Sequence, residues 1–207
     1  MNDERELRVQ LCRMGASLFN RGLTHGRTGN LSVRIDDRIL LTPTGGSLGD
    51  LDPDNLAIIN LAGEHIGGAK PSKEAFLHAA FYRARPDDRA VAHTHSTHSV
   101  AVSCLADVDP ADVLPPLTAY YAMRVGHLPL VPYHAPGDDS LRDLAERLAA
   151  DHHAILIANH GPVIGGKDLP TAVDAIEELE ETAKLALLLH GREIKPLTDE
   201  QAEALRR

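Results

Sequence analysis

The chain is poor in residue types that several classes of protein need. Among its 207 residues it has two cysteines, Cys12 and Cys104, no tryptophan and an aromatic content of 3%. Two cysteines imply no disulfide framework, so a reducing cytoplasm is the expected location. So few aromatic rings also argue against stacking platforms for nucleic-acid bases.

Long apolar runs and an excess of positive charge are missing as well. No segment approaches the roughly 20 apolar residues that span a bilayer, and the charged start MNDERELRVQ is unlike a signal peptide. The formal net charge is −9, whereas a nucleic-acid surface needs a basic stripe. We therefore expect neither a membrane nor a nucleic acid as a partner, although a local pocket can still bind an anionic small molecule.

What the chain does contain is a series of helical and strand patterns with no repeat, low-complexity tract or linker. Spacings of three to four apolar residues and capping signals predict helices in 6–23, 70–87 (with Ser72 as N-cap), 99–107, 139–153, 168–191 and 195–207. Short apolar runs between turn residues predict strands in 30–35, 38–42, on both sides of Ala62-Gly63, in 87–96, in 128–133 and twice in 153–166. Because strands come as hairpins and also between helices, we expect one domain over 1–207, an α/β fold of three layers (α/β/α) with a mixed, largely antiparallel sheet.

Two histidines lie two residues apart in the stretch VAHTHSTHS. On a strand, His93 and His95 would project from the same face, which suits two ligands of one metal ion. Polar residues at a strand edge are an equally good interpretation unless further ligands exist. His160, at the turn after the apolar strand AILIA, is the best third ligand, and three imidazoles leave zinc an open position for substrate. His98, His152 and His153 are weaker candidates, because His98 is out of the strand period and the other two lie at a helix end.

A group of polar residues marks the start of the second predicted helix. Glu74 is the best acid/base candidate, although an acidic residue in a first helical turn is common without any function. Ser72 and Lys73 beside it supply a hydroxyl and an ammonium, which together with helix N–H groups predict an anion site suited to phosphate. The TGN turn at 28–30 and the TPTGG turn at 42–46 add small, donor-rich loops, each of which is weak evidence alone.

In order along the chain, GRTGNLSVR, LLTPTGG, KPSKEAFLHAAFY, AVAHTHSTHSVAVS and LIANHGPV resemble the class II aldolase family, which includes L-fuculose-phosphate aldolase and L-ribulose-phosphate 4-epimerase. The resemblance covers nearly the whole chain. It implies one divalent ion, zinc or else manganese or cobalt, held by His93, His95 and His160. It also implies that Glu74 acts as acid/base and can reach the metal. The substrate phosphate would be bound by Gly29, Asn30, Thr44, Gly45 and Ser72.

One position departs from the fuculose aldolase pattern, in which two serines precede the glutamate. The second serine is replaced by Lys73, which we expect to orient a substrate carboxylate or phosphate, although a solvated lysine is an equally good interpretation. The segments LPPLTAYYAMRVGHLPLVPYHAPGD and EELEETAK resemble the branch of the family that decarboxylates 3-oxo-tetronate 4-phosphates. Such a β-keto acid loses carbon dioxide to leave an enediolate, which a metal ion stabilises and which becomes dihydroxyacetone phosphate on protonation.

Other activities on the same fold remain open from the sequence. A sugar-phosphate aldolase or 4-epimerase passes through a similar enediolate and is the nearest alternative. A non-catalytic, adducin-like binding protein would be expected to lack the metal histidines, which are present here. The resemblance further implies a homotetramer with sites near subunit boundaries, where Tyr120 or Tyr121 could reach a neighbour's site and Tyr120 could donate a proton.

Overall fold

The computed structural model describes residues 4–206, and its centre is one eight-stranded sheet in the order β4-β3-β2-β1-β5-β8-β7-β6. Among the strand pairs of these residues, β6 and β7 alone run parallel, and the rest are antiparallel. The strands are β1 (Asn30–Ile35), β2 (Arg38–Leu41), β3 (Ala57–Asn60), β4 (His65–Gly68), β5 (Ala90–His93), β6 (Leu130–Val131), β7 (Ala154–Ile157) and β8 (Gly161–Gly166). The expected mixed, largely antiparallel sheet is confirmed.

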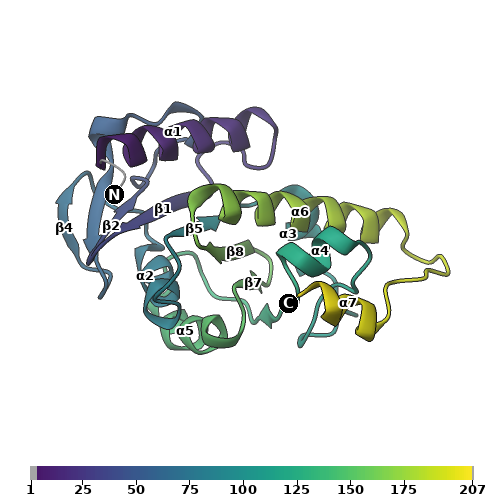
Figure 1. Cartoon of the computed structure of the whole chain (residues 1–207). Coiled ribbons are helices and arrows are strands. Elements are labelled where there is room, and N and C mark those ends of the chain that lie inside the picture. The colour runs from purple at the N-terminus through teal and green to yellow at the C-terminus, as the bar shows by residue number, and fades with distance from the viewer. Residues whose placement is uncertain (1–3, 207) are drawn as a thin grey trace.

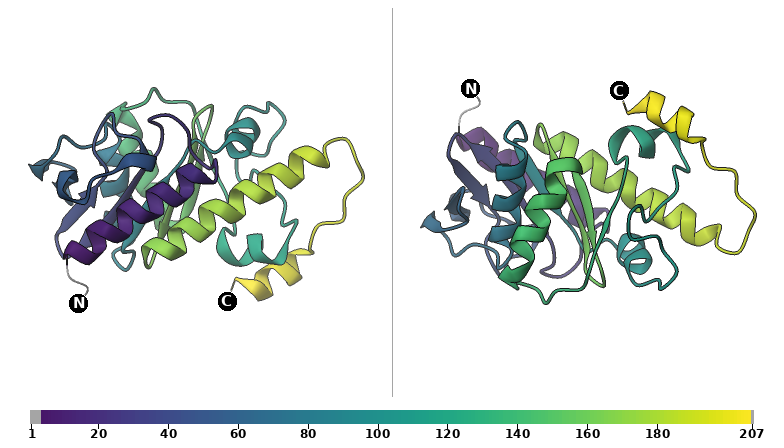
Figure 2. Two further views of the ribbon diagram at one scale, coloured as in Figure 1. Left: turned by 90° about the horizontal axis from the view of Figure 1, so that it is seen from above. Right: turned by 90° about the horizontal axis from the view of Figure 1, so that it is seen from below.

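Helices cover both faces of this sheet and complete the three expected layers (Figure 1). The first face carries α1 (Glu4–Asn20), α3 (Thr97–Ser103) and α6 (Leu169–Leu188), and the second carries α2 (Ala75–Ala84) and α5 (Arg142–Asp151). The two views of Figure 2 show α1 beside α6 from above and α2 beside α5 from below. The remaining helical elements are α4 (Ala119–Arg124) and α7 (Asp199–Leu205), which pack on each other, and the single turns η1 (Leu48–Asp50), η2 (Pro53–Asn55) and η3 (Asp139–Leu141). Within residues 4–206 no helix combines the length and the apolar character that a bilayer crossing requires.

Two apolar cores lie one on each face of the central sheet. On β5, Ala90 and Ala92 join the core under α1 and α6, whereas Val91 joins the core under α2 and α5. Because side chains alternate along a strand, His93 shares the face of Val91. The strand thus directs its terminal histidine toward the start of α2.

The start of α2 differs from the expectation. Ser72 is not the N-cap: the helix begins at Ala75, and Glu74 occupies the cap position without a side-chain cap bond. The Ser72 N–H donates to the carbonyl of Thr42 (3.3 Å), and the Ser72 hydroxyl accepts from Asn30 Nδ2 (3.2 Å) and from the N–H of Glu74 (3.3 Å). These bonds hold the segment before the helix against the 42–46 loop.

Two further expectations were inexact. The helix α4 lies between residues 107 and 128, where we predicted no helix or strand, and Thr118 caps it by accepting a hydrogen bond from the N–H of Tyr121. The strand β5 ends at His93, so His95 follows the strand instead of lying on it.

Candidate metal centre and active site

Three imidazole rings converge where the central strands end. The Nε2 atoms of His93 and His95 are 3.0 Å apart, and the ring of His160 stands edge-on to both, with centroids 4.9 and 4.6 Å away. Potential ligand atoms of the three side chains all lie within 4.8 Å of one another. The spacing of the histidines in the sequence therefore predicted a true cluster.

The turn between β7 and β8 brings His160 to this cluster. Its flanking residues have unusual backbone angles, with φ of 56° at Asn159 and 153° at Gly161. A Cβ atom on Gly161 would collide with the carbonyl oxygen of Thr94, so only glycine allows the turn to approach the end of β5 this closely. The pairing of β5 with β8 then fixes His160 beside His93.

Hydrogen bonding and burial leave the ring nitrogens ready for a cation. The Nδ1–H of His93 donates to the carbonyl of Pro162 (2.8 Å), which leaves its Nε2 as a bare lone pair facing the cluster. Burial lowers the pKa of His93, and it lowers the pKa of His95 to about 3. The Nε2 of His160 is buried and makes no well-aligned hydrogen bond, although Glu74 Oε1 lies 3.1 Å away. Imidazole nitrogens that converge in a buried space fit a divalent cation.

Glu74 completes the cluster from the start of α2. Its Oε1 lies 3.1 Å from His160 Nε2, its Oε2 lies 3.4 Å from His93 Nε2, and the same oxygen accepts a hydrogen bond from Asn30 Nδ2 (2.8 Å). Burial alone would raise the pKa of Glu74, but the facing imidazoles of His93 and His160 and the amide of Asn30 together hold it well below the ordinary value. The carboxyl group is therefore an ionised acceptor that can turn toward a metal or a substrate.

A pocket of about 300 Å³ opens beside these four side chains. Every residue that the sequence proposed for phosphate binding lines it, together with Glu74, His95 and His160: Gly29, Asn30, Thr44, Gly45, Ser72 and Lys73. Three loops that are remote in sequence thus meet in one space of substrate size. A larger cavity of about 560 Å³, between the end of α6 and the 105–117 segment, shares no lining residue with it.

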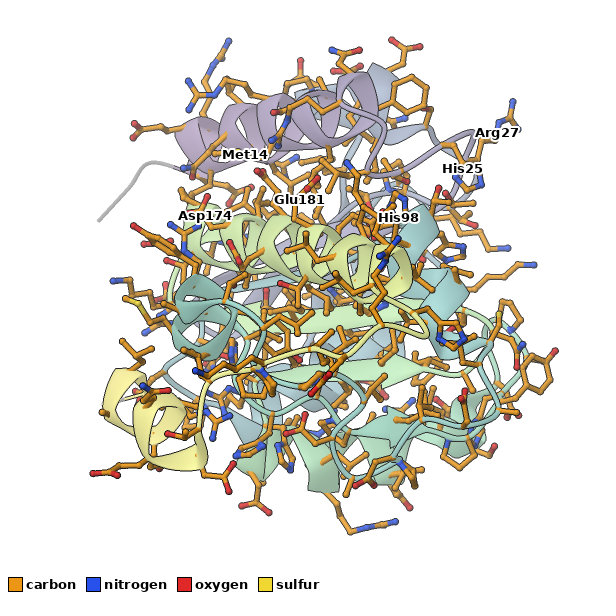
Figure 3. All side chains as sticks on the ribbon, turned by 90° about the vertical axis from the view of Figure 1, so that its right-hand side faces the viewer. Met14, His25, Arg27, His98, Asp174 and Glu181 are labelled. Atoms are coloured by element: carbon orange, nitrogen blue, oxygen red, sulfur yellow. The ribbon has the colours of Figure 1, made fainter. Side chains whose placement is uncertain are left out.

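Sequence reasoning missed one cation at the pocket. Arg27 lines the opening next to Gly29, and Figure 3 shows it on the loop after α1, extending outward from the protein. Its position directly before the TGN turn was the available signal. Tyr120 is different: it lies on α4, is 59% exposed and does not line this pocket. Within one chain the structure does not bring Tyr120 to the site.

The weaker histidine candidates have other contacts. His98 Nδ1 lies 2.8 Å from a carboxylate oxygen of Glu180, which also accepts the backbone N–H of His98. His153 places its two ring nitrogens against the carbonyl oxygens of Gly165 and Val125, and burial lowers its pKa. None of these contacts leads to the pocket.

Comparison with known proteins shows which family the chain resembles. The model of the family described as "Class II Aldolase and Adducin N-terminal domain" matches residues 9–187. A 3-oxo-tetronate 4-phosphate decarboxylase of Escherichia coli K12 is 49% identical over 98% of this chain and 96% of its own length. An L-fuculose phosphate aldolase of Methanocaldococcus jannaschii is 39% identical over 87% of this chain and 93% of its own length. A crystal structure from Klebsiella pneumoniae, whose description offers aldolase, epimerase and decarboxylase, superposes with a TM-score of 0.96 at 45% identity, covering 100% of both chains.

Proposed function

This chain belongs to the class II aldolase and adducin family, and from that membership we propose that it decarboxylates a 3-oxo-tetronate 4-phosphate to dihydroxyacetone phosphate and carbon dioxide. The observation that carries the proposal is the near full-length likeness to decarboxylases at 49% identity, against 39% for the fuculose phosphate aldolase. The enzyme is a carbon–carbon lyase. Aldol cleavage is the alternative, because it needs the same kind of metal site.

The metal of this enzyme is zinc in our proposal, held by His93, His95 and His160, with Glu74 as a fourth side chain within reach. Support comes from the bare, buried imidazole nitrogens that face one another. Three histidines with an open position are a common zinc arrangement, although manganese or cobalt also binds such sets. When bound, the cation supplies Lewis-acid stabilisation of the negative charge that develops on the substrate oxygens.

The substrate carries two anionic groups, and the pocket offers separate partners for them. We assign the phosphate to the donor-rich loops, whose members are Gly29, Asn30, Thr44, Gly45 and Ser72. Backbone N–H groups and hydroxyls of this kind bind phosphate without a net charge of their own. Lys73, at the rim, is assigned to the carboxylate that leaves as carbon dioxide, and Arg27 is the second cation within reach of either anion.

Glu74 is the residue to which we assign the proton transfer. Loss of carbon dioxide leaves an enediolate whose former C2 must be protonated to give the hydroxymethyl group of the product. Because the pKa of Glu74 is held low, its carboxylate does not store a proton beforehand. We infer that it takes a proton from water or substrate during the cycle and delivers it to carbon.

The setting of the enzyme follows from the same proposal. We place the enzyme in the breakdown of sugar acids in a reducing cytoplasm. The proposed phosphorylated substrate and the two cysteines, which form no disulfide, support this placement. We treat residues 1–207 as one domain and the working unit as a homotetramer. In that assembly Tyr120, exposed on α4, would reach the site of a neighbouring subunit as a second proton donor.

The decisive experiment is incubation of the purified, zinc-loaded protein with 3-oxo-4-phosphates of both C2 configurations. We expect equal amounts of carbon dioxide and dihydroxyacetone phosphate from one of them. A parallel incubation with ketose 1-phosphates tests the alternative. Release of an aldehyde there, with no carbon dioxide from the keto acids, would assign the chain to the aldolases.

A further inference from the structure

A continuous row of buried polar side chains runs from the site into the layer between the sheet and α2. It alternates between two elements: Asn30 and Ser32 come from β1, and Glu74, His78 and Tyr82 come from the start and body of α2. The strand residues are two apart and the helix residues four apart, so each set lies on a single face of its element. All five side chains are between 0% and 7% exposed.

Every neighbouring pair in this row is within hydrogen-bond distance. The hydroxyl oxygens of Tyr82 and Ser32 are 2.8 Å apart, and Ser32 Oγ is 2.7 Å from His78 Nδ1. His78 Nε2 is hydrogen-bonded to Asn30 Oδ1, and Asn30 Nδ2 donates to Glu74 Oε2 (2.8 Å). The row therefore ends on the carboxylate that faces the metal histidines.

The chemistry of the groups allows one direction of donation along this row. A carboxylate can only accept, so Asn30 must present its NH₂ group to Glu74 and its carbonyl oxygen to His78. The Nε2 of His78 must then carry the proton, which leaves Nδ1 as the acceptor for the Ser32 hydroxyl. Since that hydroxyl has a single hydrogen, its oxygen accepts from Tyr82. Reversing any one bond would leave a buried polar atom unpaired.

We propose that His78 is a positioning residue of the decarboxylase: it locks the Asn30 amide in the orientation that holds Glu74 beside the metal histidines, and Ser32 and Tyr82 fix the tautomer of His78. This inference rests on the proposed function, because it assigns a consequence to the placement of Glu74. The row orients and does not conduct protons, since the Asn30 amide cannot pass a proton through itself. A carboxylate displaced by about 1 Å costs on the order of 100-fold in turnover.

Two substitutions at His78 separate orientation from packing. In His78→Gln the side-chain amide occupies the place of Nε2 and can still donate to Asn30. In His78→Asn the amide occupies the place of Nδ1, near Ser32, and leaves the Asn30 carbonyl oxygen unpaired. We expect His78→Asn to lower kcat by about 10- to 100-fold, the usual effect of losing a residue that orients a metal-site ligand, with KM changed by less than about threefold. His78→Gln should recover most of that loss.

His153→Asn is the matched control for removing a buried histidine. His153 also contacts two hydrogen-bond acceptors, but these are backbone carbonyls outside the pocket. This variant should lower the melting temperature and leave kcat unchanged. Equal losses of kcat in His78→Gln and His78→Asn, or wild-type kcat in a folded His78→Asn protein, would overturn the inference.

Ser32→Ala decides the question if His78→Asn does not fold. It removes the hydroxyl that fixes the His78 tautomer and leaves a side chain of nearly the same size. We expect kcat to fall about three- to tenfold at unchanged KM and unchanged zinc content, the latter measured by metal analysis of the purified protein. Wild-type kcat in Ser32→Ala contradicts the positioning role.

The same series distinguishes failure of this inference from failure of the proposed function. If the wild-type protein releases no carbon dioxide from either 3-oxo-4-phosphate, the proposed function is wrong. The kcat values of the His78 and Ser32 variants are then compared on the reaction that the protein does catalyse, since Glu74 faces the same histidines in either case. If the wild type decarboxylates and all His78 and Ser32 variants match it, the positioning role alone is wrong.

Discussion

Asn30 and His93 lie directly opposite each other on the antiparallel strands β1 and β5, at the ends of both strands. The pairing sets an amide that contacts Glu74 beside an imidazole that faces the metal position. Gly29 permits this close pairing. Its φ is 77°, which favours glycine, and a Cβ atom there would collide with the carbonyl oxygen of His93. The loop before β1 and the end of β5 therefore meet at one end of two adjacent central strands, and a change in either is expected to affect the other.

Removing His160 should remove the metal. In His160→Ala the site loses one of three nitrogens, and two imidazoles bind a divalent ion far more weakly. We expect zinc content well below one per chain and activity lowered by at least about 100-fold. The matched control is His65→Ala, since His65 is exposed on β4 and its Nε2 contacts the carbonyl of Gly67, away from the pocket. Full zinc content and activity in His160→Ala would remove this histidine from the ligand set.

Replacing Glu74 by glutamine tests the proton transfer. Glu74→Gln keeps the shape of the side chain and its contact with Asn30 but cannot exchange a proton with the substrate. We expect turnover to fall by about 10²- to 10⁴-fold while the fold and most of the zinc remain. Glu64→Gln, in the exposed β3–β4 turn, is the control. In D₂O the wild type should place one solvent deuterium in the hydroxymethyl group of the product, and near wild-type turnover with stereospecific labelling in Glu74→Gln would shift the donor role to Tyr120 or to water.

The role of Lys73 can be separated from that of the phosphate loops. Lys73→Ser restores the residue found in fuculose-type aldolases, and we expect kcat/KM for decarboxylation to fall by about 10- to 100-fold, as for loss of a charge-assisted hydrogen bond. Inhibition by inorganic phosphate should change little if the lysine serves the carboxylate. Lys70→Ser, three residues earlier and outside the pocket, should match the wild type. Loss of phosphate inhibition in Lys73→Ser reassigns the lysine to the phosphate.

The buried His78 gives a signature in the pH dependence of stability. Burial lowers its pKa from the ordinary 6.5 of histidine to about 3, so between these pH values the unfolded chain binds a proton that the folded chain does not. Folded-state stability is therefore lost as pH falls from about 6.5 toward 3, with a slope of about 1.4 kcal/mol per pH unit from this group.

The measurement is denaturant unfolding of the metal-free protein between pH 7 and pH 4.5, compared with His78→Gln. Other buried histidines contribute to both proteins, so the difference between the two slopes reports His78 alone. We expect the wild-type slope to exceed that of His78→Gln. Parallel slopes would mean that His78 is protonated in the folded state.

How much of this site the sequence predicts depends on how local each signal is. The histidines of the cluster could be found because an HxH pair at a strand end and a histidine at a strand-to-strand turn are short patterns. The loops proposed to bind phosphate needed the family resemblance, because each turn is unremarkable alone. The start of α2 was placed too early because Ser72 does accept backbone N–H groups of the next turn, yet regular helix begins only at Ala75.

The row from Tyr82 to Glu74 was out of reach for a similar reason. The spacing of Glu74, His78 and Tyr82 along a helix is visible in the sequence, and so is the spacing of Asn30 and Ser32 along a strand. What the sequence does not give is that this helix face packs on this strand face, which the order of the central strands decides. Buried histidine and tyrosine on a helix otherwise look like ordinary core residues.

His93 and the turn that carries His160 belong to adjacent strands, yet His93 and its partner Pro162 are 69 residues apart in the chain. On the ribosome the pair His93 and His95 is synthesised well before His160 exists. Until His160 is made, the nascent chain has two of the three imidazoles that we propose as zinc ligands, and two bind a divalent ion far more weakly than three. If the proposed ligand set is right, zinc loading follows the pairing of β5 with β8, and the zinc-loaded fraction in a cell then reports completed folding as well as zinc supply.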